Sequence, residues 1–253
     1  MIRRPPRSTL SSSSAASDVY KRQVYDPFPA ILPVNIPLKA LHRLEGVKWD
    51  CRVRVRADGK TLAKSEGELL FTAYGISGPA ALGVSRAVST LAAEGKIAEL
   101  YLDFFPDTPA DELRSLLARL WRDREKPLAL SLRGILKKRM PEVLLGIWGI
   151  DPALPVGSLS PAMKESVAAG LKSLALTPGD PRSFDEAVVA AGGVDVNEVN
   201  PATMESKIVR GLYITGELLD IDGDSGGYNL QFAWSTGALA GTAASEHGGK
   251  ARK

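Results

Sequence analysis

A loop rich in glycine and aspartate, residues 216–227, holds the residue types best suited to chemistry in this chain. Gly226 and Gly227 lack a Cβ atom, so their amides can approach a ligand closely and adopt positive φ angles. A helix is predicted to begin at Tyr228, and free amides at a helix N-terminus favour a negatively charged group. The spacing indicates a site for a phosphate, or for a ring oxygen that becomes negative on reduction. An ordinary turn with incidental glycines is the alternative explanation.

The elements beside this loop would position it. The apolar, β-branched run at 212–215 predicts a buried strand that ends at Gly216. The pattern from Tyr228 onward predicts a helix, and its small residues, including Gly237 and Gly241, suit close approach by another backbone. The sequence therefore predicts a strand, a glycine loop and a helix in succession.

Three segments resemble one family. The run GLYITGELLDIDGDSGGYNLQFAWSTGALAG (211–241) resembles the C-terminal FAD segment of the BaiN/RdsA-type flavoproteins, which are NAD(P)/FAD-dependent oxidoreductases of the aminoacetone-oxidase kind. The resemblance continues in AGGVDVNEVNPATMESKIV (191–209) and in GELLFTAYGISGPAALGVSR (67–86). It implies an α/β fold, or α+β for a fragment, in which a β-rich substrate domain with an inserted helical subdomain accompanies the last strand, loop and helix of a Rossmann-like FAD-binding domain.

The resemblance also implies site residues. It assigns cofactor contacts to Gly216, Glu217, Asp220, Gly226, Gly227, Tyr228, Asn229 and Leu230. The residues from Gly226 to Leu230 would lie at the pyrimidine end of the flavin, and Glu217 and Asp220 near the ribityl chain or its phosphate. A second glycine loop would border the active site through Thr72, Gly75, Ser77 and Gly78. Members of the family often have histidine at the position of Ala73, so no catalytic residue is assigned.

The implied function is flavin-dependent oxidation or reduction. Hydride would pass between FAD and a small organic substrate, with NAD(P)H as the candidate electron donor. However, no G-x-G-x-x-G motif follows a predicted strand, so we expect a C-terminal fragment that binds FAD weakly or not at all without its βαβ unit. The alternatives are a truncated product without catalytic activity, or a non-redox nucleotide-binding protein. The latter would need a lysine or metal-binding acids, for which only Asp222 and Asp224 are near.

The bulk composition restricts partners. The 253 residues include 32 basic and 29 acidic groups, but residues 1–23 hold five of the basic groups and one acid. The remainder has 27 basic and 28 acidic groups, a net charge of −1, so no nucleic-acid partner is predicted. No apolar run reaches the length of about 20 residues that a membrane span needs. One cysteine fits a reducing compartment, hence a cytoplasmic location, and one cysteine with two histidines leaves little material for a metal site.

Residues 1–23 are rich in arginine and serine and lack apolar periodicity. An organellar transit peptide or a disordered tail would share this composition. We favour a third interpretation, because RRPPRSTL and SSAASDVYKRQ resemble translated sequencing-adapter read-through at the start of reading frames from assembled environmental DNA. The leader is therefore excluded from the predicted fold.

The remaining chain predicts alternating β-rich and helical parts. The predicted organisation is a non-native leader (1–23), a β-rich substrate domain (24–106), an inserted helical subdomain (107–174), a return to the β-rich domain (175–210) and the C-terminal part of the FAD-binding domain (211–253). Prolines in residues 24–37 favour an extended segment rather than a central strand. Alternation around Cys51 predicts a strand with a wet arginine face, which is either simply solvated or an anionic-substrate patch, and Asp58-Gly59 predicts a hairpin turn.

Local details complete these expectations. Ser77 and Thr108 are predicted to cap the helices that follow them. Gly192-Gly193 is predicted to form a turn. The basic run at residues 137–139 is expected to be solvated, and the helical block has no chemical constellation of its own.

Overall fold

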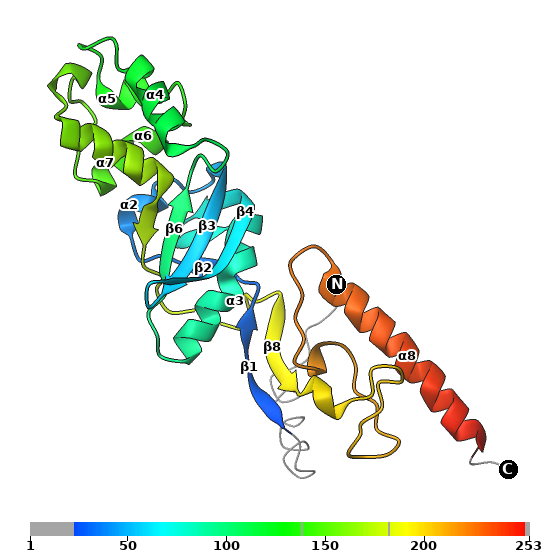
Figure 1. Ribbon diagram of the computed structural model, residues 1–253. Helices are drawn as coiled ribbons and strands as arrows, with labels where there is room; N and C mark the ends of the chain where they lie inside the picture. The colour runs from blue at the N-terminus through cyan, green and yellow to red at the C-terminus, as the bar shows by residue number, and fades with distance from the viewer. Residues whose placement is uncertain (1–22, 138, 182, 251–253) are drawn as a thin grey trace. The chain divides into compact units, whose positions relative to one another are not determined.

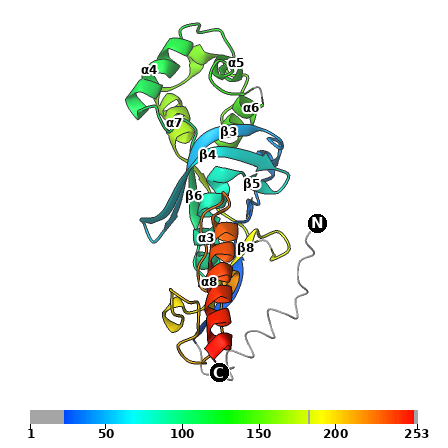
Figure 2. The same cartoon turned by 90° about the vertical axis from the view of Figure 1, so that its right-hand side faces the viewer.

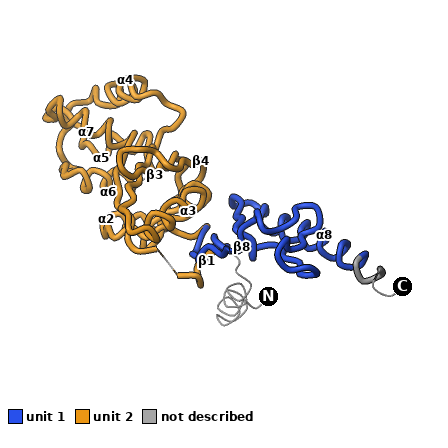
Figure 3. The backbone as a smooth tube through the Cα atoms, turned by 60° about the horizontal axis from the view of Figure 1, so that its bottom comes forward, with its two compact units in different colours: residues 1–30, 188–253 blue, residues 31–187 orange. Residues whose placement is uncertain are grey.

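The computed structural model describes residues 23–137, 139–181 and 183–250, so nearly all of the predicted leader lies outside the described residues. The chain divides into two compact units, coloured in Figure 3. Unit 1 holds the residues up to Ala30 and from Val188 onward, and unit 2 holds residues 31–187. The finer domain boundaries stay predictions.

Unit 2 is built on one antiparallel sheet of six strands in the order β2-β5-β4-β3-β6-β7 (Figure 1). The strands are β2 (Val34–Asn35), β3 (Lys48–Ala57), β4 (Lys60–Thr72), β5 (Gly75–Ser77), β6 (Glu99–Asp103) and β7 (Leu174–Leu176). The short helix α2 (Lys39–His42) follows β2, and α3 (Pro79–Ala93) packs against the sheet through Ala80, Ala81 and Val84.

The hairpin of β3 and β4 forms as predicted. Cys51, Val53 and Val55 are fully buried. Asp58 and Gly59 both have positive φ angles, 50° and 74°, which suit a tight hairpin turn.

Two of the three arginines on the wet face of β3, Arg52 and Arg56, are paired within the hairpin, whereas Arg54 Nε is buried without a hydrogen-bond partner among the described residues. Arg52 donates to Glu66 over 2.7 Å, and Arg56 donates to the carbonyl of Gly59 over 2.7 Å. The Arg56 guanidinium also lies 5.4 Å from the centroid of the Tyr101 ring. For Arg52 and Arg56, these contacts favour a structural role over an anionic-substrate patch.

The second glycine loop is part of the sheet. Its first residues form β5, and α3 is capped at Gly78, with no side-chain cap. The prediction that Ser77 caps this helix is therefore wrong, because Ser77 still belongs to the strand and pairs with Leu70. A Cβ at Gly78 would lie 2.6 Å from the carbonyl oxygen of Glu68, so this site needs glycine.

The predicted helical block follows β6. It contains α4 (Ala110–Leu120), α5 (Leu128–Leu132), α6 (Met140–Ile147), the 3-10 turn η1 (Val156–Ser158) and α7 (Pro161–Lys172). Figures 1 and 2 both show these helices beyond one end of the sheet. One hydrophobic core runs from the sheet into the block, with Phe71 and Phe104 among its largest buried side chains.

Two details of this block differ from expectation. Thr108 does not cap α4, because Pro109 is extended and the helix begins only at Ala110. The basic run is not simply solvated, since Lys137 donates to the carbonyl of Lys48 and Arg139 donates to the carbonyl of Glu45 over 3.0 Å. Residue 138 lies outside the described residues.

Burial raises the pKa of the Cys51 thiol to about 12, and the Asp103 carboxylate adds to this effect. In the unfolded chain the thiol ionises near its ordinary pKa of about 8.5. Raising the pH above about 9 therefore ionises the unfolded chain first and lowers stability progressively toward pH 12. We expect the free energy of unfolding to fall more steeply between pH 8 and 10.5 in the wild type than in Cys51→Ala. Parallel slopes in urea titrations of the two proteins would contradict this account.

Unit 1 contains a two-stranded antiparallel sheet, β1 (Val24–Ala30) with β8 (Val189–Val194). The proline-rich β1 is indeed not a central strand, and its pairing is irregular between Tyr25 and Phe28. Gly192 and Gly193 lie within β8 and do not form the predicted turn. They are glycines because a Cβ at either would come within 2.6 Å of a backbone carbonyl oxygen, that of Asp26 or Leu218.

The rest of unit 1 comprises two 3-10 turns and one long helix. These are η2 (Val196–Glu198), η3 (Gly216–Leu218) and α8 (Tyr228–Lys250). The helix begins at the predicted residue. A small core of Val194, Val199, Met204, Ile214, Leu219 and Ala240 joins these parts. Within the described residues, no helix combines the length and the apolar character needed to cross a bilayer.

The strand predicted over residues 212–215 does not form. The β-pairing of this segment within the described residues is an isolated bridge between Tyr213 and Glu205. The backbone bonds of this segment go to a nearby turn, since Ser206 donates to the Leu212 carbonyl over 2.7 Å and Ile214 donates to that of Met204 over 2.9 Å. This local pairing replaces the sheet neighbours that a buried strand requires.

Candidate functional site

The glycine loop of unit 1 leads directly into α8. Gly226 and Gly227 have φ angles of 129° and 93°, which an L side chain rarely adopts. A Cβ at Gly227 would meet no atom within 4 Å outside its chain neighbours, so space remains open beside this backbone. The first turn of α8 places the amides of Tyr228 and Leu230 after the loop. This end of the helix can therefore receive a flat or anionic group against its amides.

Asn229 holds the loop in place. Its side-chain Oδ1 accepts from the Gly223 amide over 2.8 Å, and its Nδ2 donates to the Gly223 carbonyl over 2.9 Å. Both polar ends of the side chain are therefore used within the protein. The structure gives Asn229 a positioning role, and a ligand contact from this residue would come from its backbone.

The predicted residues at the start of the loop contact the protein itself. The Gly216 amide donates to Thr236 Oγ1 over 3.0 Å, which fastens η3 to α8. The Glu217 carboxylate accepts from the Ala190 amide, and the Asp220 amide donates to the Val194 carbonyl over 2.9 Å. Glu217 therefore holds β8 from an exposed position, and its cofactor role stays a prediction.

Large side chains on α8 are exposed beside the loop. Tyr228, Leu230 and Trp234 expose 66%, 61% and 68% of their surfaces. Sequence reasoning named the first two but missed Trp234, because an aromatic residue in a helical pattern is ordinarily assigned to the core. Exposed apolar surface next to a glycine loop suits a ligand with a flat, apolar ring.

Tyr25 is a second residue that the sequence did not indicate. The nearby carboxylate of Asp195 raises the pKa of Tyr25, with smaller effects of burial and of Asp220. Gln23 Nε2 donates to the Tyr25 hydroxyl over 3.3 Å. Tyr25 is therefore a protonated donor among acids, and only the folded pairing of β1 with β8 brings these residues together.

The second predicted site belongs to unit 2. Thr72 pairs with Gly75 across β4 and β5, and Thr72 Oγ1 accepts from the Tyr74 amide over 3.5 Å. Ser77 ends β5 and Gly78 caps α3, as described above. A Cβ at Gly75 would lie 2.2 Å from the Val34 carbonyl oxygen, so both Gly75 and Gly78 are explained by close backbone packing, and their role at an active site stays a prediction.

Comparisons with known proteins bear on this arrangement. The family model described as HI0933-like protein barrel and H2TH domain matches residues 28–189. The chain is 38% identical over 219 residues to the 3-dehydro-bile acid delta(4,6)-reductase of Clostridium scindens, which covers 86% of this chain and 54% of that protein. It is also similar to the ribosomal RNA dihydrouridine synthases of Haemophilus influenzae, 31% identical over 172 residues, and Escherichia coli, 32% identical over 170 residues. These matches cover 67% and 66% of this chain and 40% of each synthase, so the chain spans about half or less of each relative's length.

Proposed function

The chain belongs to the HI0933-like family of flavoprotein oxidoreductases, and on that premise we propose that its α8 loop forms the ring end of an FAD site. The observation that supports this proposal is the pair of positive φ angles at Gly226 and Gly227 immediately before the long helix α8. Two such glycines and a helix N-terminus together offer donors to a ring oxygen without a side chain in the way.

The proposed roles of the residues follow from their positions. The backbone amides of Gly227 and Tyr228 would donate to the pyrimidine oxygen of the flavin, which becomes negative on reduction. The two hydrogen bonds between the Asn229 side chain and the Gly223 backbone would keep the loop from closing over the space beside Gly227. When bound, FAD supplies the hydride chemistry, and the protein supplies binding, orientation and electrostatic stabilisation.

The proposed reaction is reduction of a carbon–carbon double bond in a small organic substrate, with NAD(P)H as electron donor. The bile acid reductase supports this choice, since it shares 38% identity with the chain. The two ribosomal RNA enzymes favour a second candidate, uridine in RNA, and stand against the predicted exclusion of nucleic acid. Residues 24–253 have a net charge of −1, which favours the small substrate. A cytoplasmic location is proposed on the ground of the single, reduced Cys51.

The proposal predicts that the chain binds reduced FAD more tightly than oxidised FAD. Amides aimed at a developing negative charge stabilise the reduced form preferentially, so the midpoint potential of FAD should rise in the presence of excess chain. Each tenfold preference raises the potential by about 30 mV for a two-electron couple. Spectroelectrochemical titration measures this change directly. An unchanged or lowered potential at concentrations where FAD is bound would contradict the proposed role of the amides.

A further inference from the structure

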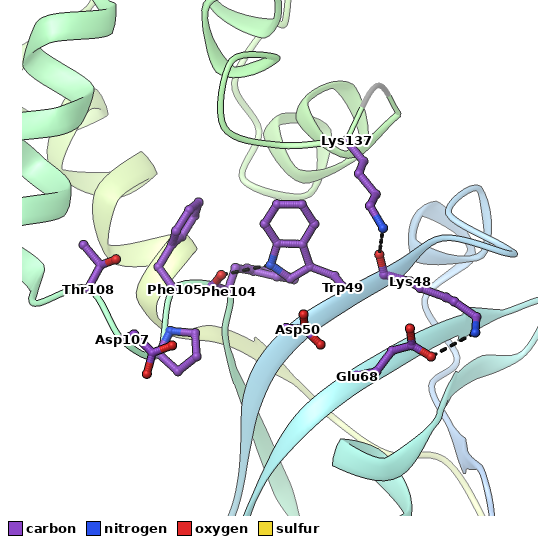
Figure 4. A pocket seen from close by; sticks show the side chains of 10 residues that line it. Lys48, Trp49, Asp50, Glu68, Phe104, Phe105, Asp107, Thr108 and Lys137 are labelled. Atoms are coloured by element: carbon purple, nitrogen blue, oxygen red, sulfur yellow. Dashed lines mark hydrogen bonds and ion pairs between the residues drawn. The ribbon is translucent and has the colours of Figure 1, made fainter.

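Unit 2 contains a cavity of about 350 Å³ that no part of the proposed flavin site uses (Figure 4). It lies among the first residues of β3, the middle of β4, the segment after β6 and Lys137. This volume lies within the range of small-molecule sites. The residues that argue for a ligand are Trp49, Phe105, Asp50, Asp107, Lys48 and Lys137.

One wall of the cavity is aromatic and held in place. Trp49 Nε1 donates to the Phe104 carbonyl over 2.9 Å. The Trp49 ring meets Phe105 edge to face, with centroids 6.1 Å apart and an interplanar angle of 69°. Because the indole donor is already bonded, the Trp49 ring offers a ligand its apolar surface and its π face.

Lys172 holds the segment after β6, residues 104–108, in position through hydrogen bonds to its backbone. Lys172 Nζ donates to the carbonyls of Phe105 and Thr108 over 2.6 and 2.9 Å. It also pairs with the buried carboxylate of Asp103 over 2.9 Å. The wall is therefore formed before any ligand arrives, and little ordering cost is added on binding.

The charges at the rim are unequally matched. Lys48 pairs with Glu68 over 2.9 Å, so these two cancel. Asp50 and Asp107 form no ion pair or side-chain hydrogen bond with any described residue, and both are exposed at the rim. The remaining base, Lys137, donates to the Lys48 carbonyl and lies 6.0 Å from the centroid of the Trp49 ring. Two carboxylates against one ammonium leave the cavity net negative.

We infer that this cavity binds an organic cation with a flat or apolar body, such as an aromatic amine or amidine. The ring of the ligand would lie against Trp49 and Phe105, and its charged nitrogen would face Asp50 and Asp107. The Lys137 ammonium lies 6.0 Å from the centroid of the Trp49 ring, so the protein itself places positive charge beside this ring. Lys137 also repels a cationic ligand, and this repulsion lowers the affinity of the cavity for the cation.

Three probes of matched shape test the inference: benzamidine, benzamide and benzoate. We expect the cation benzamidine to bind the full chain about tenfold more tightly than neutral benzamide, the order expected for a charge-assisted hydrogen bond. Benzoate should not bind detectably. Calorimetry or amide chemical shifts would measure the three affinities, and added salt should weaken only benzamidine.

Variants locate the binding. Asp50→Asn should weaken benzamidine about tenfold and leave benzamide unchanged. Trp49→Leu should weaken both probes, and Lys137→Met should strengthen benzamidine severalfold because it removes a like charge. Glu112→Gln, an exposed change on α4, is the matched control and should have no effect. Circular dichroism checks that each variant is folded, and Asp50→Asn remains decisive if Trp49→Leu does not fold.

The opposing outcomes are equally specific. Preferential binding of benzoate that Lys137→Met abolishes would show an anion site and overturn the inference. Benzamidine binding that Asp50→Asn and Asp107→Asn leave unchanged would place the cation elsewhere and also overturn it. Failure of benzamidine to bind at millimolar concentration would show that the cavity does not take such a cation.

Discussion

Replacement of Gly78 by alanine is expected to lower the free energy of unfolding of unit 2 by about 2–5 kcal/mol. Gly78 has a φ angle of 84°, and a Cβ there would lie 2.6 Å from the Glu68 carbonyl oxygen and 3.1 Å from the Leu70 nitrogen. Strain of the backbone and collision with β4 add together, because neither the strand nor the start of α3 can move freely. Urea unfolding measured by tryptophan fluorescence would give the change.

Gly95→Ala is the matched control for this substitution. Gly95 has a φ angle of 68°, but a Cβ there would meet nothing within 4 Å. The control therefore keeps the conformational strain and omits the collision, and about 1–2 kcal/mol is expected. Equal losses at Gly78 and Gly95 would show that close packing of the glycine loop on β4 contributes nothing.

The second large effect is expected at Gly227. Gly227→Val places a β-branched side chain in the open space beside a φ angle of 93°, where the proposed ring would lie. We expect FAD binding to fall at least tenfold while the fold of unit 2 is kept. Titration of backbone amide shifts with millimolar FAD, in the wild type and in the variant, measures this loss.

The matched control for that experiment is Gly237→Val on the same helix. Gly237 is exposed in the middle of α8, and a Cβ there would meet nothing within 4 Å. A valine at this position tests the cost of a β-branched residue in α8 without approaching the loop. Equal FAD affinity in Gly227→Val and in the wild type would contradict the proposed position of the flavin ring beside Gly227.

Local patterns predicted much of the fold. The alternation around Cys51, with Asp58-Gly59 behind it, predicted the β3–β4 hairpin because burial and turn chemistry agree there. The start of α8 at Tyr228 was predicted because the glycine loop ends at Gly227 and the helical sequence pattern begins at the next residue. Family motifs predicted a relationship to the BaiN/RdsA-type flavoproteins, and the HI0933-like family match and the identity to the bile acid reductase confirm it.

The features that could not be predicted from the sequence depend on contacts between residues that are distant in the chain. Gly192 and Gly193 have the composition of a turn, yet β1 and η3 come so close that only glycine fits within β8. The run at 212–215 has the composition of a buried strand, but its backbone bonds go to a turn near Met204. Lys137 lies far in the chain from Trp49, and only the fold brings both to one cavity.

The most direct test of the central claim is a map of backbone amide shifts in the isotopically labelled chain during titration with FAD. A millimolar dissociation constant represents about 4 kcal/mol of binding free energy, of which the helix end supplies about 1–2 kcal/mol and contacts with the flavin ring must supply the rest, so the titration should extend to millimolar FAD. The account predicts that the largest shifts occur at Gly226, Gly227 and Tyr228 and disappear in Gly227→Val. Shifts confined to unit 2, or none at the α8 loop, would contradict it.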